Sequence, residues 1–120
     1  MTYRNKSASE EGINRSGEKC VICGWAKRNA AGKSFVIGAH VRPFETGSEF
    51  DKADNIIGLC PNHHTEFDNY NFYVDPEDLT LHFRDSNDEY EGVCIEKNVR
   101  HIKKDYWAYR LYLYRKHYQK

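Results

Sequence analysis

The chain has 120 residues, of which 39% are hydrophobic and 30% charged, and this composition fits one small domain with a thin core that a bound metal would help to stabilise. No apolar run approaches the roughly 20 residues of a membrane span, and the polar N-terminus is no secretory signal, so we expect a cytoplasmic protein without membrane contact. The formal net charge of zero hides basic flanks, +5 over residues 1–44 and +6 over 92–120, around a middle of −11, so the flanks could attract a polyanion and the middle a cation.

Residues 1–18 are polar and are predicted to be a loose, flexible arm, which leaves residues 19–120 as the domain. The domain opens with CVICGW, residues 20–25, which is typical of a tight zinc-knuckle turn. Gly24 supplies the permissive backbone directly after the second cysteine.

A strand is predicted next, over the apolar and β-branched residues 34–41, and Pro43 would end it. A polar loop and a brief buried segment over residues 55–59 follow. Pro61 is a favourable first helical residue, and the helix is predicted to run from His63 to about Asn69.

Residues 72–74 and 79–83 alternate around DPED and predict a hairpin. A helix is predicted over about residues 96–117, because apolar side chains recur there on one helical face. That face consists of Val99, Ile102, Tyr106, Tyr109 and Leu113. The elements together predict a small α+β domain with a long C-terminal helix.

Four cysteines in a chain without a signal peptide favour a metal site over disulfides. Cys20 and Cys23 form one ligand pair, and Cys60 with His63 repeats the same two-residue gap, so the spacing predicts a structural Cys3His zinc site. Cys94 is the alternative fourth ligand. Metal-free thiols are a further alternative, and a redox Cys-x-x-Cys site is disfavoured because no βαβ pattern surrounds it.

A second set of residues has the chemistry of metal-assisted phosphodiester cleavage. His40 ends the predicted strand, where an imidazole can take a proton from water. His64 and Asp68 are four residues apart on the predicted helix, so both side chains can face one divalent ion. Asn55 can bond loop backbone and orient His40. Each of these residues alone would more often be structural, and their joint order gives the prediction its weight.

The segments AHVRP from residue 39, NIIGLC from residue 55 and HTEFD from residue 64 carry a resemblance. In order and spacing they resemble HNH endonucleases of the ββα-metal fold, and in particular restriction-type HNH domains with a structural zinc. The resemblance covers about residues 20–83. In one respect the chain departs from many members, which have Asp or His directly before the base where this chain has Ala39.

The resemblance implies a ββα-metal nuclease domain in which His40 is the general base, Asn55 the positioning residue and His64 a metal ligand. Asp68 is expected to share the catalytic divalent ion, Mg²⁺, Mn²⁺, Ni²⁺ or Zn²⁺, and the loop residues Asp51 and Asp54 could contribute. The implied reaction is hydrolysis of DNA phosphodiester bonds that leaves 5′-phosphate and 3′-hydroxyl ends.

Basic side chains predicted to contact the DNA backbone lie before the strand, just after the base and on the C-terminal helix. They are Arg42, Lys33, Lys103 and Arg110. The aromatic side chains of that helix exceed what one buried stripe requires, which also fits a homodimer contact. Two other functions remain open: an inactive, zinc-stapled nucleic-acid-binding module, and a protein-interaction domain acting through the aromatic helix.

Overall fold

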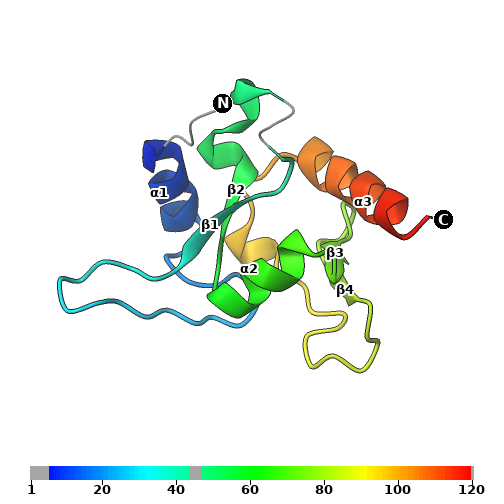
Figure 1. Cartoon of the computed structure of the whole chain (residues 1–120), viewed down its shortest axis with the longest axis horizontal. Helices are drawn as coiled ribbons and strands as arrows, with labels where there is room; N and C mark the ends of the chain where they lie inside the picture. Colours follow the sequence, from blue (N-terminus) through cyan, green and yellow to red (C-terminus); the bar gives the residue numbers. More distant parts are fainter. Residues whose placement is uncertain (1–5, 44–46, 120) are drawn as a thin grey trace.

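The structure is a computed structural model that describes residues 6–43 and 47–119. Strands β1 (Ile37–His40) and β2 (Ile56–Leu59) form an antiparallel hairpin, and helix α2 (Pro61–Asp68) follows β2 and packs against both strands (Figure 1). Ile37 pairs with Leu59 and His40 with Ile56, so His40 lies where β2 begins. This ββα unit is the α+β fold that the sequence predicts.

Helix α1 (Lys6–Arg15) occupies most of the segment predicted to be a loose arm, so that prediction is wrong for residues 6–15, while residues 1–5 lie outside the described residues. Small residues recur every four positions, at Ala8, Gly12 and Ser16, and all three are buried. This stripe lets α1 approach the hairpin closely, since a Cβ at Gly12 would lie 2.5 Å from that of Ile56. The polar composition of residues 6–15 gave no sign of α1, because this helix is held by the close approach of its backbone to the hairpin.

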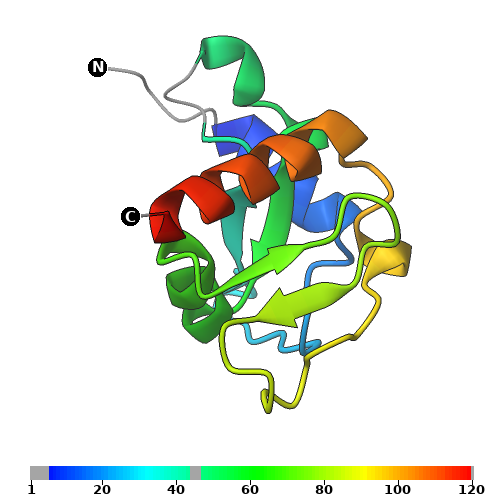
Figure 2. The same cartoon turned by 90° about the vertical axis from the view of Figure 1, so that its right-hand side faces the viewer.

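The predicted second hairpin is present as β3 (Phe72–Val74) and β4 (Leu81–Phe83), which Figure 2 shows on the side away from α1. Its inward aromatic rings join α2 to the core. The ring centroids of Phe67 and Phe72 are 5.4 Å apart, and those of Phe72 and Phe83 4.9 Å apart. The hairpin therefore packs against α2 in the same core as β1 and β2.

Helix α3 (Lys104–Tyr118) begins later than predicted, because residues Glu96–Asn98 form a 3-10 helix and an extended Lys103 (φ −68°, ψ 137°) precedes α3. Val99 and Ile102 are buried, at 1% and 8% exposed, but from a turn. Their i, i+3 spacing suits a turn as well as a helix, and this is why the apolar pattern predicted a longer helix. None of the helices within the described ranges is long and apolar enough to cross a membrane.

Candidate metal centre and active site

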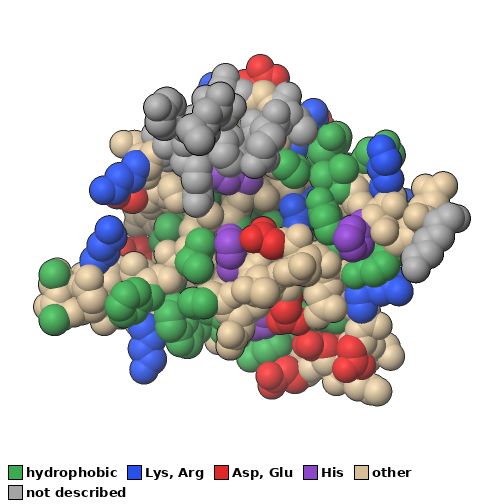
Figure 3. All heavy atoms as spheres, in the orientation of Figure 1, with side chains coloured by type: hydrophobic (Ala, Val, Ile, Leu, Met, Phe, Trp, Pro, Cys, Tyr) green, Lys and Arg blue, Asp and Glu red, His purple; other side chains and the backbone are tan. Residues whose placement is uncertain are grey.

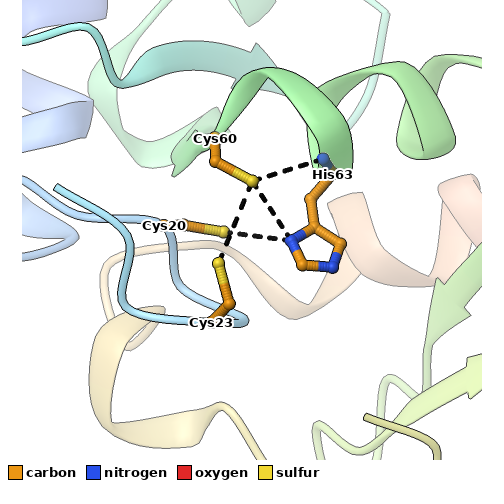
Figure 4. A group of neighbouring side chains, drawn as sticks. All are labelled: Cys20, Cys23, Cys60 and His63. Carbon is orange, nitrogen blue, oxygen red and sulfur yellow. Dashed lines mark hydrogen bonds between the residues drawn. The ribbon is translucent and has the colours of Figure 1, made fainter. Parts of the chain in front are cut away.

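The four predicted zinc ligands converge. Cys20 and Cys23 come from the turn after α1, and Cys60 and His63 from the start of α2, and their side chains point into one small space (Figure 4). All four donor atoms lie within 4.8 Å of one another. His63 Nδ1 is 3.5 Å from the sulfur of Cys20 and 3.3 Å from that of Cys60, and the sulfurs of Cys23 and Cys60 are 3.9 Å apart.

These spacings fit a tetrahedral zinc ion. With bonds of about 2.3 Å to sulfur and 2.0–2.1 Å to nitrogen, the ligand atoms of such an ion are separated by about 3.5–3.8 Å. Burial raises the pKa of the Cys20 thiol to about 12, because it disfavours the charged thiolate. A cation among the sulfurs would stabilise the thiolate and lower this pKa. The donor set and its geometry therefore suit a structural metal such as zinc.

Local backbone explains why the ligands meet. The Cys20 carbonyl accepts a hydrogen bond from the Gly24 N–H, and Gly24 has a φ of +76°, so glycine closes the knuckle without strain. Cys60 is the N-cap of α2, and its sulfur accepts from the His63 N–H at 3.4 Å. Cys94 is exposed and donates to the Asp78 carbonyl, so the fourth donor of this cluster is His63, as predicted.

Glu66 lies next to the outer ring nitrogen of His63, and the sequence did not single out this glutamate as a site residue. Its Oε2 atom is 3.7 Å from His63 Nε2, and its Oε1 atom accepts from the Asn71 side chain at 2.6 Å. A carboxylate on the outer ring nitrogen favours the tautomer whose Nδ1 lone pair faces the sulfurs. The three-residue step from His63 to Glu66 along a helix is the sequence signal that could have identified it.

Asn55 is fully buried and holds the loop that follows β1. Its Oδ1 atom accepts from the Arg42 N–H at 2.8 Å, and its Nδ2 group donates to the carbonyls of Arg42 at 2.8 Å and Phe50 at 2.7 Å. These bonds use the side chain's acceptor and both of its N–H groups. The asparagine thereby fixes the backbone on both flanks of the loop between His40 and β2.

His40 is at the end of β1, as predicted, and its side chain is 8% exposed. Its Nε2 atom is 2.7 Å from Oδ1 of Asp51, whose side chain is 5% exposed. Sequence reasoning considered Asp51 only as a loop residue that could help to bind the ion. Asp51 lies in a loop outside any helix or strand, so no helical or strand period could have paired it with His40.

His64 and Asp68 share one face of α2, and His64 Nδ1 lies 3.6 Å from Asp68 Oδ2. Their side chains are 27% and 60% exposed, so solvent or a substrate can reach both. An imidazole nitrogen and a carboxylate this close can bind one divalent ion and leave coordination positions for water and phosphate.

The residues predicted to contact DNA are in different settings. The guanidinium of Arg42 lies between the rings of Phe50 and Tyr109, 4.0 Å from each centroid. Lys33 is exposed in the loop before β1, and the Lys103 ammonium is 3.5 Å from Asp54.

The prediction that Arg110 contacts DNA is contradicted by its burial in the domain. It is 4% exposed, stacks over Phe67 and Tyr70, and donates to the Phe67 carbonyl. Desolvation lowers the pKa of its guanidinium. It therefore pins α3 to α2 inside the domain.

Charge is unevenly spread over the face seen in Figure 1. Figure 3 shows Lys and Arg side chains along the side formed by α1 and the loop before β1, histidine and acidic side chains near the centre, and an acidic group over the loop after β4. Figure 3 also shows Lys and Arg side chains on the side of α3, so this face has basic side chains to either side and an acidic group below.

Residues 20–75 match the family model described as HNH endonuclease. This segment contains the metal cluster, the β1–β2 hairpin and α2. Over these residues the chain is therefore similar to HNH endonucleases. The match and the ββα architecture bear out the predicted resemblance to HNH endonucleases.

A solved structure titled "Modification dependent TagI restriction endonuclease" resembles the whole domain. It superposes with a TM-score of 0.73 and 28% sequence identity over 92% of this chain. The chain spans 38% of the length of that protein. No curated protein sequence gives a significant match.

Proposed function

We propose that this domain is a metal-dependent endonuclease that hydrolyses DNA phosphodiester bonds and leaves 5′-phosphate and 3′-hydroxyl ends. The observation that best supports it is that β1, which ends at the buried, carboxylate-bound His40, packs against α2, which carries the accessible His64–Asp68 pair. A proton acceptor and a two-residue metal-binding pair on adjacent elements are the parts that such a hydrolysis needs.

His40 would take a proton from the attacking water, and Asn55 would hold the intervening loop in place. His64 and Asp68 are the residues that would hold the catalytic divalent ion, Mg²⁺, Mn²⁺, Ni²⁺ or Zn²⁺. The chemistry that such an ion supplies when bound is polarisation of a phosphoryl oxygen and stabilisation of the leaving 3′ oxygen. Arg42 and Lys33 would contact the DNA backbone. Lys103 would also contact it if its ammonium left Asp54 and bound a DNA phosphate instead.

The Cys20, Cys23, Cys60 and His63 cluster would hold a structural zinc ion. The ion would fasten the knuckle to the first turn of α2, directly beside His64. We propose a restriction role as well, because the similar structure is titled a modification-dependent restriction endonuclease. Recognition of a modified base is not assigned to this domain, since most of that protein lies outside the match.

The test is nicking of supercoiled plasmid DNA with added Mg²⁺, Mn²⁺ or Ni²⁺. We expect the wild type to nick, and His40→Ala and His64→Ala to lose about 10²–10⁴-fold in rate. His117→Ala, an exposed change on α3, is the control and should leave the rate unchanged. Religation of the nicks by DNA ligase would establish the predicted ends. Equal cleavage by wild type and His40→Ala would remove His40 from the mechanism.

An inactive nucleic-acid-binding module is the second candidate, and Ala39 favours it because this buried residue supplies no ligand before the base. Metal titration separates the two functions. The nuclease should bind one tight zinc ion and a second, weaker divalent ion, and the inactive module only the first.

A further inference from the structure

The His40–Asp51 pair goes beyond what the family motif assigns. Both side chains are almost fully buried, at 8% and 5% exposed, and His40 Nε2 is 2.7 Å from Asp51 Oδ1. An ionised carboxylate can only accept hydrogen bonds. The ring nitrogen facing it must therefore carry the hydrogen, and in neutral His40 the lone pair is then on Nδ1.

The backbone that carries Asp51 is fixed on both sides. The preceding Phe50 carbonyl accepts from the buried Asn55 side chain at 2.7 Å, and the Phe50 ring packs edge-on against Tyr106 of α3, with centroids 5.7 Å apart. After Asp51, the 3-10 helix Ala53–Asn55 leads directly into β2. The residue before Asp51 is thus held by the same buried asparagine that anchors Arg42.

A second histidine–carboxylate pair in the molecule differs in setting. His82 Nδ1 is 3.0 Å from Glu91 Oε2, but these side chains are 35% and 27% exposed. Bulk solvent competes for the atoms of such an exposed pair more than it does for the buried Nε2–Oδ1 contact between His40 and Asp51. Burial therefore lets the carboxylate at His40 impose a single tautomer more strongly than Glu91 does at His82.

We propose that Asp51 is the positioning residue of the nuclease site, holding His40 in its Nε2–H tautomer so that Nδ1 accepts the proton of the attacking water; this rests on the proposed function. In that step the water oxygen forms a bond to phosphorus and the bond to the 3′ oxygen breaks. The water proton moves to Nδ1, and the 3′ oxygen takes a proton from solvent. The Asp51 carboxylate stabilises the imidazolium that results.

The experiment joins a spectroscopic readout to kinetics. Imidazole ¹⁵N shifts of the full chain distinguish the two neutral tautomers, at a pH about two units above the ordinary histidine pKa. The His40 signals are assigned by their loss in His40→Gln. Wild type should show the Nε2–H form at His40. Asp51→Asn, whose amide can donate as well as accept, should show a mixture and lower kcat about 10–100-fold with KM unchanged.

Glu91→Gln is the matched control and should move only the His82 signals and leave kcat unchanged. A His40 tautomer that is the same in Asp51→Asn and Asp51→Ala as in wild type would overturn the proposal. So would a loss of weak-metal binding in Asp51→Asn with that tautomer retained, because Asp51 would then be a metal ligand. If Asp51→Asn shifts the His40 tautomer but the wild type cuts no DNA, the proposed function is overturned instead. A catalytic role for the His40–Asp51 pair would fall with it.

Discussion

Arg110 lies inside the domain, where its guanidinium carbon is 3.8 Å from the Phe67 ring centroid and 4.5 Å from that of Tyr70. Its N–H group donates to the Phe67 carbonyl near the end of α2. The planar fork both stacks and donates, which a lysine cannot do in the same space. From the sequence, a basic residue on an aromatic helix was predicted to contact DNA. The structure shows that Arg110 is only 4% exposed, and this burial is what separates it from a DNA-contacting residue.

We therefore expect Arg110→Lys to lower the free energy of unfolding by about 1–3 kcal/mol, because a buried carbonyl loses its partner. Urea denaturation measures it, with the exposed Arg115→Lys on the same helix as the control. DNA affinity of the folded variant should be unchanged. Weaker DNA binding at undiminished stability would return Arg110 to the DNA-binding surface.

Residue identity predicted some parts of the site better than others. The metal ligands and the His40, Asn55 and His64 triplet follow from local spacing and from the family motif, and the structure brings Cys20, Cys23, Cys60 and His63 together. Asp51 could not be predicted in its present place. Its contact with His40 depends on the path of a loop, and a loop has no sequence period.

At the scale of elements, β1, the β3–β4 hairpin and α2 were predictable, because an apolar β-branched run, alternation and an N-terminal proline specify them locally. Residues 55–59 were expected only as a brief buried segment, and their pairing with β1 as strand β2 was not predicted from the residues. Helix α1 was missed because it has few large apolar residues. Its stability depends on close approach to β2, a tertiary effect that a helix-propensity argument does not include. The start of α3 was misplaced for the related reason that a turn can bury residues at helical spacing.

The packing of α1 makes a prediction with an unusual sign. Gly→Ala within a helix is normally stabilising, by about 0.5–1 kcal/mol. At Gly12 the added Cβ would meet Ile56, so we expect Gly12→Ala to lower the free energy of unfolding by about 1–3 kcal/mol. Thermal and urea unfolding measure it, with the exposed Glu10→Ala as the control. A stabilised Gly12→Ala protein would mean that α1 does not pack on β2 this closely.

The metal cluster joins two elements, the knuckle and α2, so losing one ligand should loosen both. We expect Cys60→Ser to lose its zinc and to melt at a lower temperature. Cys94→Ser should keep one zinc ion per chain and melt as the wild type does, because Cys94 is exposed and bonds the Asp78 carbonyl. Metal analysis and thermal melting measure both. Zinc lost from Cys94→Ser and kept by Cys60→Ser would reverse the ligand assignment.

At the scale of the whole molecule, α3 bears on the predicted homodimer. Tyr106, Trp107 and Tyr114 are buried against their own domain, while Tyr112 is 55% exposed. Much of the aromatic surplus that favoured a partner surface is therefore used internally. Dimerisation through α3 stays a prediction, which sedimentation equilibrium tests.

The central claim is that His40 and His64 face one gap that admits a metal ion and a DNA phosphate. Anomalous diffraction from crystals grown with Mn²⁺ and a short phosphorothioate duplex tests this most directly. We predict a manganese peak bonded to His64, with a DNA phosphate between it and Nδ1 of His40. A peak remote from His64, or packed side chains filling the space between the two rings, would contradict the claim.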